Sequence, residues 1–319
     1  RPIGVRLAPL NASIYPVQYA VVLNQYANFA SVIDTTNDSV IGNFETGIYG
    51  EKAVFNANGT RLYVTDRFKD SVHVFRVDTG PFFTQIAEVQ TGNTDLERAN
   101  PRDLDLSTDG KTLYVANTLG HTLAVINVEG DANTLVKLMP VGGLSTDVKV
   151  VGHWGIVSGQ ETNTRLNEPE SGHGVPTKDA NGIARRNNGQ PLGYLPVMSD
   201  ATKATTFDDL GSELNIFDTA TNRFVYRYVD EGRDISQLVI PGQFVDLHDH
   251  VNAQKIIKGS SPEQMTIRGN LLFVTMANSE NVQAFRINQN ATDPSQLLTP
   301  LDIVEVGIML LSIHHPYNF

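Results

Sequence analysis

The fold is decided by a stretch that reads Asn100-Pro-Arg-Asp-Leu-Asp-Leu-Ser-Thr-Asp-Gly-Lys-Thr-Leu-Tyr-Val-Ala-Asn117. Aspartate and leucine alternate over residues 103–106, which is the period-2 pattern of a strand with two unlike faces. Asp109-Gly110 predicts a tight turn, because both residue types tolerate the positive φ that hairpins demand. Thr112 to Ala116 is a nearly continuous β-forming run, which is typical of a strand buried on both faces. The stretch therefore predicts a β-hairpin.

Two further strands extend this hairpin into a four-stranded unit. The third is expected at Thr122-Leu-Ala-Val-Ile-Asn127 and the fourth from Leu135 to Val141, ending at Gly142-Gly143. Four antiparallel strands within about 45 residues make one blade of a β-propeller.

The same pattern recurs along the chain. Residues 51–92 repeat it with Asn58-Gly59 at the turn, and residues 18–47 and 263–307 repeat it more loosely. Valines align these copies in one column, with steps of 42, 51, 42 and 117 residues between Val22, Val64, Val115, Val157 and Val274. Self-similarity at a near-constant period indicates a repeat architecture, so we expect an all-β propeller of four-stranded antiparallel blades.

Two short motifs carry a family resemblance. Tyr63-Val-Thr-Asp66 and Tyr114-Val-Ala-Asn117 each follow a glycine turn and precede a valine-rich strand, and this pattern resembles the YVTN-type β-propeller repeat. The resemblance covers about residues 18–160 well, and 210–230 and 260–319 less closely. It implies a bacterial or archaeal extracytoplasmic protein, in the periplasm or at the cell surface. Some members of this repeat family are joined to c-type cytochrome or peroxidase-like domains.

The repeats predict five blades, two insertions and an N-terminal arm. The arm is residues 1–17, with an edge strand at Ile3 to Leu7. The blades are expected at 18–48, 51–92, 101–143, 146–230 and 262–307, with insertions at about 160–211 and 232–260. Long loops in compact domains are usually functional or disordered.

The C-terminal run from Ile308 to Ile313 reads as the first strand of a sixth repeat. Because five blades and one strand do not close a ring in any obvious way, we expect a chain truncated after residue 319. The alternative is a small ring that the N-terminal arm and this last strand complete.

Composition excludes several function classes. The net charge of −11 argues against nucleic acid or anionic lipid as a partner, and no apolar run reaches membrane-spanning length. The chain has no cysteine, so it forms no disulfide, thiolate metal site or c-type haem attachment within these residues. It begins with Arg1-Pro2-Ile3 rather than methionine, which favours a processed N-terminus and, with the resemblance, an extracytoplasmic location.

Histidines form the candidate metal site. His248 and His250 are two residues apart, which in a strand points both imidazoles to one side, as a zinc or copper site requires. His153 and His173 are candidates to converge on them from neighbouring loops. The competing interpretation is a polar loop with solvated histidines, because two ligands do not make a site.

Other candidate ligands are weaker. His173 between two glycines is a candidate haem or copper ligand, although such glycines also simply permit a tight loop. A calcium site is conceivable at Asp200, Asp208, Asp209 and Glu213, whose spacing matches no EF-hand. We find no nucleophile motif and no phosphate-binding glycine loop, so no catalytic residue is assigned.

Two functions remain open. The first is a non-enzymatic interaction or scaffold subunit of a larger assembly, in which the insertions 160–211 and 232–260 contact a protein partner. The second is the propeller part of a periplasmic redox protein, whose copper or haem lies in a partner or in a domain beyond residue 319.

Overall fold

The structure is a computed structural model that describes residues 1–92, 98–141, 144–160, 213–229, 262–276 and 281–305. It also describes four two-residue strands, which pair as β15 (Thr177–Lys178) with β16 (Ala184–Arg185) and β19 (Arg233–Asp234) with β20 (Ile256–Ile257). The chain is all-β: its described residues form five four-stranded antiparallel sheets, each of them a propeller blade.

The blades follow one another along the chain. The first contains β1 (Pro2–Leu7), β2 (Tyr19–Asn24), β3 (Phe29–Asp34) and β4 (Ser39–Glu45). The second contains β5 (Gly50–Phe55), β6 (Arg61–Asp66), β7 (Ser71–Asp78) and β8 (Phe82–Gln90). The third contains β9 (Pro101–Leu106), β10 (Thr112–Asn117), β11 (Thr122–Asn127) and β12 (Thr134–Pro140).

The last two blades flank the predicted insertions. The fourth contains β13 (Leu144–Val151), β14 (Trp154–Gln160), β17 (Glu213–Asp218) and β18 (Arg223–Val229). The fifth contains β21 (Pro262–Arg268), β22 (Leu271–Met276), β23 (Asn281–Ile287) and β24 (Leu298–Glu305), with the short 3-10 helix η3 (Pro294–Gln296) before its last strand.

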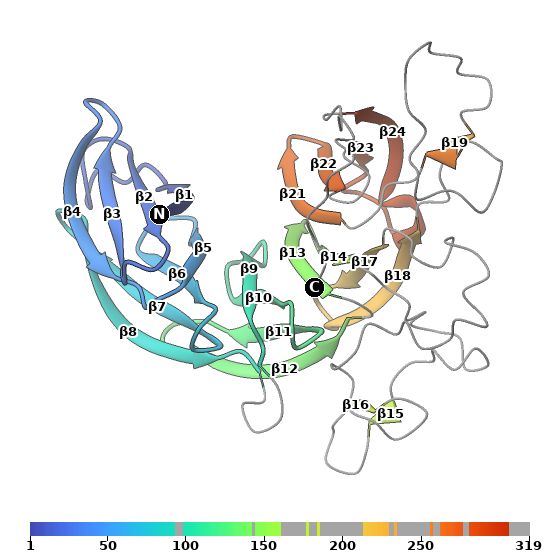
Figure 1. Ribbon diagram of the computed structural model, residues 1–319, viewed down its shortest axis with the longest axis horizontal. Coiled ribbons are helices and arrows are strands. Elements are labelled where there is room, and N and C mark those ends of the chain that lie inside the picture. The colour runs from blue at the N-terminus through green and yellow to red at the C-terminus, as the bar shows by residue number, and fades with distance from the viewer. Residues whose placement is uncertain are drawn as a thin grey trace, which may run out of the picture.

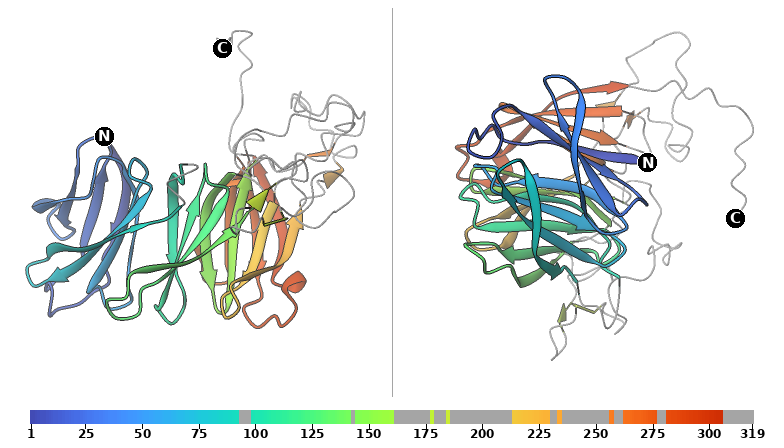
Figure 2. Two further views of the ribbon diagram at one scale, coloured as in Figure 1. Left: turned by 90° about the horizontal axis from the view of Figure 1, so that it is seen from below. Right: turned by 90° about the vertical axis from the view of Figure 1, so that its left-hand side faces the viewer.

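The five blades stand side by side in an open arc (Figure 1). The first strands of successive blades, β1, β5, β9, β13 and β21, contact one another in that order along its inner side. The blades are seen edge-on in Figure 2, where the N-terminus lies at one end of the first blade. The segment expected as an N-terminal arm therefore includes β1, the inner strand of the first sheet. Within the described residues no helix is long and apolar enough to cross a membrane.

Each pair of neighbouring blades encloses an apolar core. In the run Leu113 to Ala116, every side chain is buried, because the third blade packs against a neighbour on both faces. Buried aliphatic and aromatic side chains each contribute about 1.5–3 kcal/mol. The four cores are represented by Val32 with Phe75, Val74 with Val115, Tyr114 with Phe217, and Ile216 with Val274.

The hairpin turns differ from the predicted geometry in one respect. At Asp109-Gly110 the glycine alone has positive φ, +71°. Asp109 instead accepts hydrogen bonds from the Ser107 hydroxyl, at 2.6 Å, and from the Lys111 amide, at 3.0 Å. Aspartate is favoured here because its side chain satisfies the backbone of the turn.

Candidate functional site: a tyrosine–arginine patch on the loop face

One face of the arc is formed by the loops that join the second strand of each blade to the third, and the fourth strand to the next blade. We call it the loop face. The strands on either side of the predicted insertions end there, because Gly159 pairs with Glu213 and Glu213 pairs with Val229. Gly159, Glu213 and Val229 correspond to Asp66, Ser71 and Gln90, which pair at the same end of the strands in the second blade. The described strands that precede the two insertions therefore both end on the loop face.

Tyr26 lies on this face between β2 and β3. Its backbone has a φ of 64°, which is rare for a bulky residue, and its amide donates to the Ile48 carbonyl at 3.1 Å. The ring meets Tyr49 edge to face, with centroids 5.0 Å apart, and its hydroxyl donates to the Tyr49 hydroxyl at 3.3 Å. Tyr26 nevertheless remains 67% exposed. An exposed aromatic side chain on a strained backbone is a candidate functional residue.

Arg67 extends the surface from Tyr49. Its guanidinium carbon lies 5.1 Å from the centroid of the Tyr49 ring, a cation–π contact. Its Nη1 donates to Glu51 at 2.6 Å and its Nε to Asn100 at 3.0 Å. Because the Glu51 side chain is almost fully buried, the pair holds Arg67 in one orientation.

Phe68 and Arg98 form the other side of the surface. Phe68 is 57% exposed, and the Arg98 guanidinium carbon lies 5.7 Å from the centroid of its ring. Arg98 also donates from Nη2 to the carbonyls of Arg67 and Phe68, at 2.8 and 2.7 Å, and pairs with Asp70 at 3.1 Å. Arg98 therefore connects its own loop to the loop that carries the exposed ring of Phe68.

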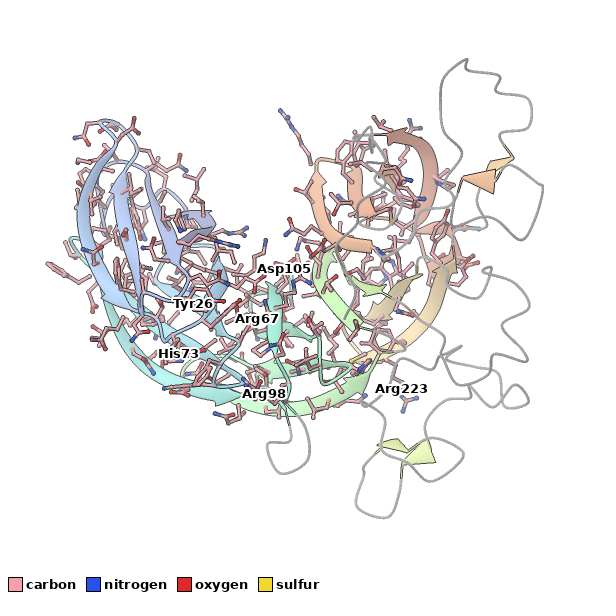
Figure 3. All side chains as sticks on the ribbon, viewed as in Figure 1. Tyr26, Arg67, His73, Arg98, Asp105 and Arg223 are labelled. Carbon is pink, nitrogen blue, oxygen red and sulfur yellow. The ribbon has the colours of Figure 1, made fainter. Side chains whose placement is uncertain are left out.

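A hydrogen bond from Arg98 to the Arg67 carbonyl links the two groups, which we together call the Tyr–Arg patch: Tyr26, Ile48, Tyr49, Arg67, Phe68 and Arg98. Tyr26 and Arg67 follow one another along the arc, and Arg98 lies nearer its outer edge (Figure 3). The hydrogen bond with Tyr26 and then burial raise the pKa of Tyr49, so the Tyr49 phenol is neutral at physiological pH. Tyrosine, phenylalanine and arginine on a pre-ordered surface are the residue types enriched in protein interfaces.

A second group of charges lies on the inner strands. Arg102 on β9 pairs with Glu51 on β5, at 3.5 Å, and with Glu263 on β21. It therefore joins the second, third and fifth blades across the inner side of the arc. Arg102 shares Glu51 with Arg67, and its two ion pairs hold the inner strands of these three blades next to one another.

Asp103, Asp147 and Lys149 form a buried triad beside it. Lys149 contacts both carboxylates, at 2.6 Å from Asp103. The backbone amide of Met265 donates to Asp147 at 2.8 Å, and that of Val148 donates to Asp103 at 3.4 Å. Each aspartate thus binds the inner strand of the next blade.

The triad places one ammonium between two carboxyls. Burial raises the pKa of both carboxyls; at Asp103 the Lys149 charge and hydrogen bonds from Asp147 and Lys149 outweigh it, and the pKa lies below the ordinary value. At Asp147, burial and the Asp103 charge outweigh Lys149 and hold the pKa well above the ordinary value. The pKa values of the two carboxyls are therefore displaced in opposite directions beside one ammonium, which suits a structural tie between blades.

The predicted metal ligands are not brought together among the described residues. His173, His248 and His250 lie outside those residues, as do Asp200, Asp208 and Asp209. His153 is exposed in the turn between β13 and β14; its ring lies 4.2 Å from that of Trp154, and its carbonyl accepts from Thr219. Across the part of the chain that the structure describes, no three His, Asp or Glu side chains are grouped as a metal would require.

Sequence reasoning missed both the Tyr–Arg patch and the triad. The available signal for the patch was an aromatic or arginine residue directly after a second strand, as in Asp66-Arg67-Phe68. The signal for the triad was charge within strands that the repeat places on the inner side of the arc.

Comparisons with known proteins bear on the fold. Residues 42–164 match the model of a family described as Lactonase, 7-bladed beta-propeller. No curated protein matches the sequence. A protein from Lactobacillus plantarum has a similar structure, with a TM-score of 0.54 at 14% identity over 95% of this chain and 71% of that one.

Two further solved structures share this fold. Kuenenia stuttgartiensis hydrazine synthase matches with a TM-score of 0.50 at 13% identity, over 96% of this chain and 87% of that one. A chain of the mitotic checkpoint complex matches with a TM-score of 0.52 at 9% identity, over 91% and 63% of the two chains. At these identities the likeness shows a shared propeller fold and carries no activity over to this chain.

Proposed function

We propose that this chain is the propeller of an extracytoplasmic protein-interaction subunit, which holds a partner protein on its loop face as part of a larger assembly. The observation that carries the proposal is the Tyr–Arg patch, in which Tyr26 and Phe68 are more than half exposed while the residues beneath them are fixed. A rigid surface loses little conformational freedom when it binds, so more of the contact energy becomes affinity.

The position of the patch supports a protein partner. The described strands on either side of the predicted contact segments, about 160–211 and 232–260, end on the same face as the patch. An aromatic cluster beside paired arginines fits another polypeptide, with its mixture of apolar and polar groups. The net charge of −11 supports a protein rather than a nucleic acid as the partner.

The redox alternative stays a prediction, because it depends on the repeat resemblance and on His153, His173, His248 and His250. Haem or copper in stoichiometric amount in the natively purified protein would support it. An interaction subunit without a redox role contains neither.

Removing the exposed rings is expected to weaken the assembly without unfolding the propeller. We choose Tyr26→Asn, because asparagine tolerates positive φ, and Phe68→Ser. Loss of interface aromatic anchors typically costs about 2 kcal/mol or more of binding, which is roughly a thirtyfold loss of affinity. Surface substitutions usually change folding stability by no more than about 0.5 kcal/mol. The measurement is the mass of the natively purified complex by light scattering, beside urea unfolding.

Val136→Ser provides the matched control, since Val136 is 62% exposed and lies on β12, which contributes no residue to the patch. It should leave both the complex and the stability unchanged. An unaltered complex in the Tyr26→Asn/Phe68→Ser double variant would refute the patch as the contact surface.

A further inference from the structure

His73 is a buried histidine on β7 of the second blade, the blade that also carries Arg67 of the patch (Figure 3). Its side chain is 3% exposed. The Nε2 atom lies 3.4 Å from Asp66 Oδ2, and the Nδ1 atom lies 3.2 Å from Gln85 Oε1. Among the described residues, neither His73 Nε2 nor Asp66 Oδ2 has a hydrogen-bond partner. Two buried polar atoms that face each other without bonding require an explanation.

The arrangement around His73 suits the protonated imidazole better than the neutral one. A neutral imidazole carries one N–H group, whereas the imidazolium carries two. Because an oxygen faces each ring nitrogen, neutral His73 leaves one oxygen opposite a nitrogen lone pair, and protonated His73 donates to both oxygens. Histidine is also the side chain that changes its charge between about pH 5 and 8. The contact with Asp66 should therefore tighten when His73 takes up a proton.

Two carboxyl groups and one ammonium lie around the imidazole on the second blade. Asp66 is at the end of β6, and Glu88 on β8 has its Oε2 atom 4.0 Å from Nε2. Lys69, in the turn between β6 and β7, pairs with Glu88 at 3.1 Å. Burial raises the pKa of Asp66, but the contact with His73 and the hydrogen bonds from the Phe68 and Lys69 amides outweigh burial, and the pKa lies below its ordinary value. Asp66 therefore stays ionised throughout the range in which histidines titrate.

The first blade contributes backbone to this contact through Gly47, in the connection between β4 and β5. A Cβ added to Gly47 would overlap the Asp66 carboxylate and lie 3.3 Å from His73 Nε2. Glu45 is exposed and lies on the opposite face of β4, because Phe44 faces the second blade. A closer approach of the imidazole to the carboxylate therefore acts directly on the backbone of this connection.

Asp66 and Gly47 each hold one loop of the patch. The Oδ1 atom of Asp66 accepts the backbone amide of Phe68 at 2.9 Å. Gly47 lies two residues before Tyr49, whose carbonyl accepts the Arg67 amide at 3.2 Å. The two loops that supply most of the patch thus meet at one carboxylate, and the imidazole contacts the other oxygen of that carboxylate.

We propose that His73 is a pH-sensitive contact that regulates the Tyr–Arg patch: on protonation it binds Asp66, holds the 46–49 and 66–69 loops together, and so lets the patch bind its partner more tightly below neutral pH. This regulation rests on the proposed function, because it concerns the same surface. The contact itself is a property of the isolated chain and needs no partner.

Selective isotope labelling tests the contact. In protein that carries ¹⁵N-labelled phenylalanine and lysine, the Phe68 and Lys69 amide resonances should shift in one transition between about pH 5 and 8. His73→Gln removes the titrating group, and Asp66→Asn keeps an acceptor for the amides but removes the charge, so each variant should abolish the transition. His153→Gln is the control, because His153 is exposed in the turn between β13 and β14, and it should leave the transition unchanged.

The natively purified complex tests the regulation. We follow its dissociation on dilution by light scattering at about pH 6 and about pH 8, on either side of the ordinary histidine range. The apparent dissociation constant should be on the order of fivefold lower at the acid pH, which is the lower end of typical coupling between two sites. His73→Gln should remove this difference, and His153→Gln should retain it.

Two kinds of result would overturn the proposal. One is amide resonances that show no transition in the parent, or that show the same transition in His73→Gln. The other is a complex that dissociates equally at both pH values, or whose pH dependence survives His73→Gln. Failure of the proposed function is a different result: the Tyr26→Asn/Phe68→Ser variant would keep its complex, while the His73-dependent transition would still be present in the isolated chain.

Discussion

Gly155→Ala is expected to destabilise the fourth blade by about 2–3 kcal/mol, as overpacking of a filled core does. Gly155 on β14 is directly opposed to Phe217 on β17, and the phenyl ring covers the glycine. An added Cβ would lie 1.9 Å from the ring, so the ring would have to leave its site. Phe217 is fully buried against Tyr114, with centroids 4.8 Å apart, and moving it would disturb the core between the third and fourth blades.

The reason for this cost is testable by a double-mutant cycle. Phe217→Leu shortens the obstructing side chain, so Gly155→Ala should cost less in that background, with a coupling energy of about 1–2 kcal/mol. Gly42→Ala is the control, because an added Cβ there meets nothing within 4 Å. Urea unfolding measures all four variants and the parent. Additive free energies of unfolding would show that the Phe217 ring is not the obstruction.

Much of this fold was predictable because blade formation is local. Antiparallel strands joined by short turns lie next to each other in sequence, so the alternation and the glycine turns around Tyr63 and Tyr114 were enough to indicate blades. The repeat also placed the strands Glu213–Asp218 and Arg223–Val229 in the fourth blade, across more than 50 intervening residues.

The candidate site was harder to predict from the sequence, because its contacts join separate loops. Tyr26 meets Tyr49 only when the first two blades pack together, and Arg98 reaches Phe68 across another connection. The alternation over residues 103–106 predicts Asp103 on the polar side of a two-faced strand, yet Asp103 is buried. Its partners are the Val148 amide and the Lys149 ammonium, 45 and 46 residues further on. A local pattern does not reveal which amide a neighbouring blade will present.

Lys149→Met is expected to be the most destabilising single substitution that leaves apolar packing in place. Methionine preserves most of the aliphatic stem but removes the ammonium that Asp103 contacts at 2.6 Å. Asp103 is buried, so it would be left as an uncompensated charge in an environment that favours its neutral form. Breaking a buried ion pair in this way costs about 3–5 kcal/mol. Lys111→Met is the control, because the Lys111–Glu129 pair is exposed and worth at most about 1 kcal/mol.

The loss should depend on pH in a direction that the triad determines. In the parent, the lowered pKa of Asp103 contributes stability above its unfolded-state pKa of about 3.9, and this is lost as the pH falls through the folded-state pKa. The raised pKa of Lys149 contributes stability below its unfolded-state pKa of about 10.4, and this is lost as the pH rises through the folded-state pKa. At neutral pH both contributions are present, so the Lys149→Met deficit should be near its largest there.

Toward acid the variant should recover relative to the parent. Without Lys149, burial raises the pKa of Asp103, so the folded variant takes up a proton and becomes more stable as the pH falls. Urea unfolding at neutral pH and at about pH 4 measures this change, and Asp103→Asn in the Lys149→Met background should restore stability at neutral pH by removing the stranded charge. Asp147→Asn alone should cost little, because the raised pKa of Asp147 favours its neutral form. A Lys149→Met deficit that stays constant with pH and survives Asp103→Asn would show that lost packing, rather than lost charge, is its cause.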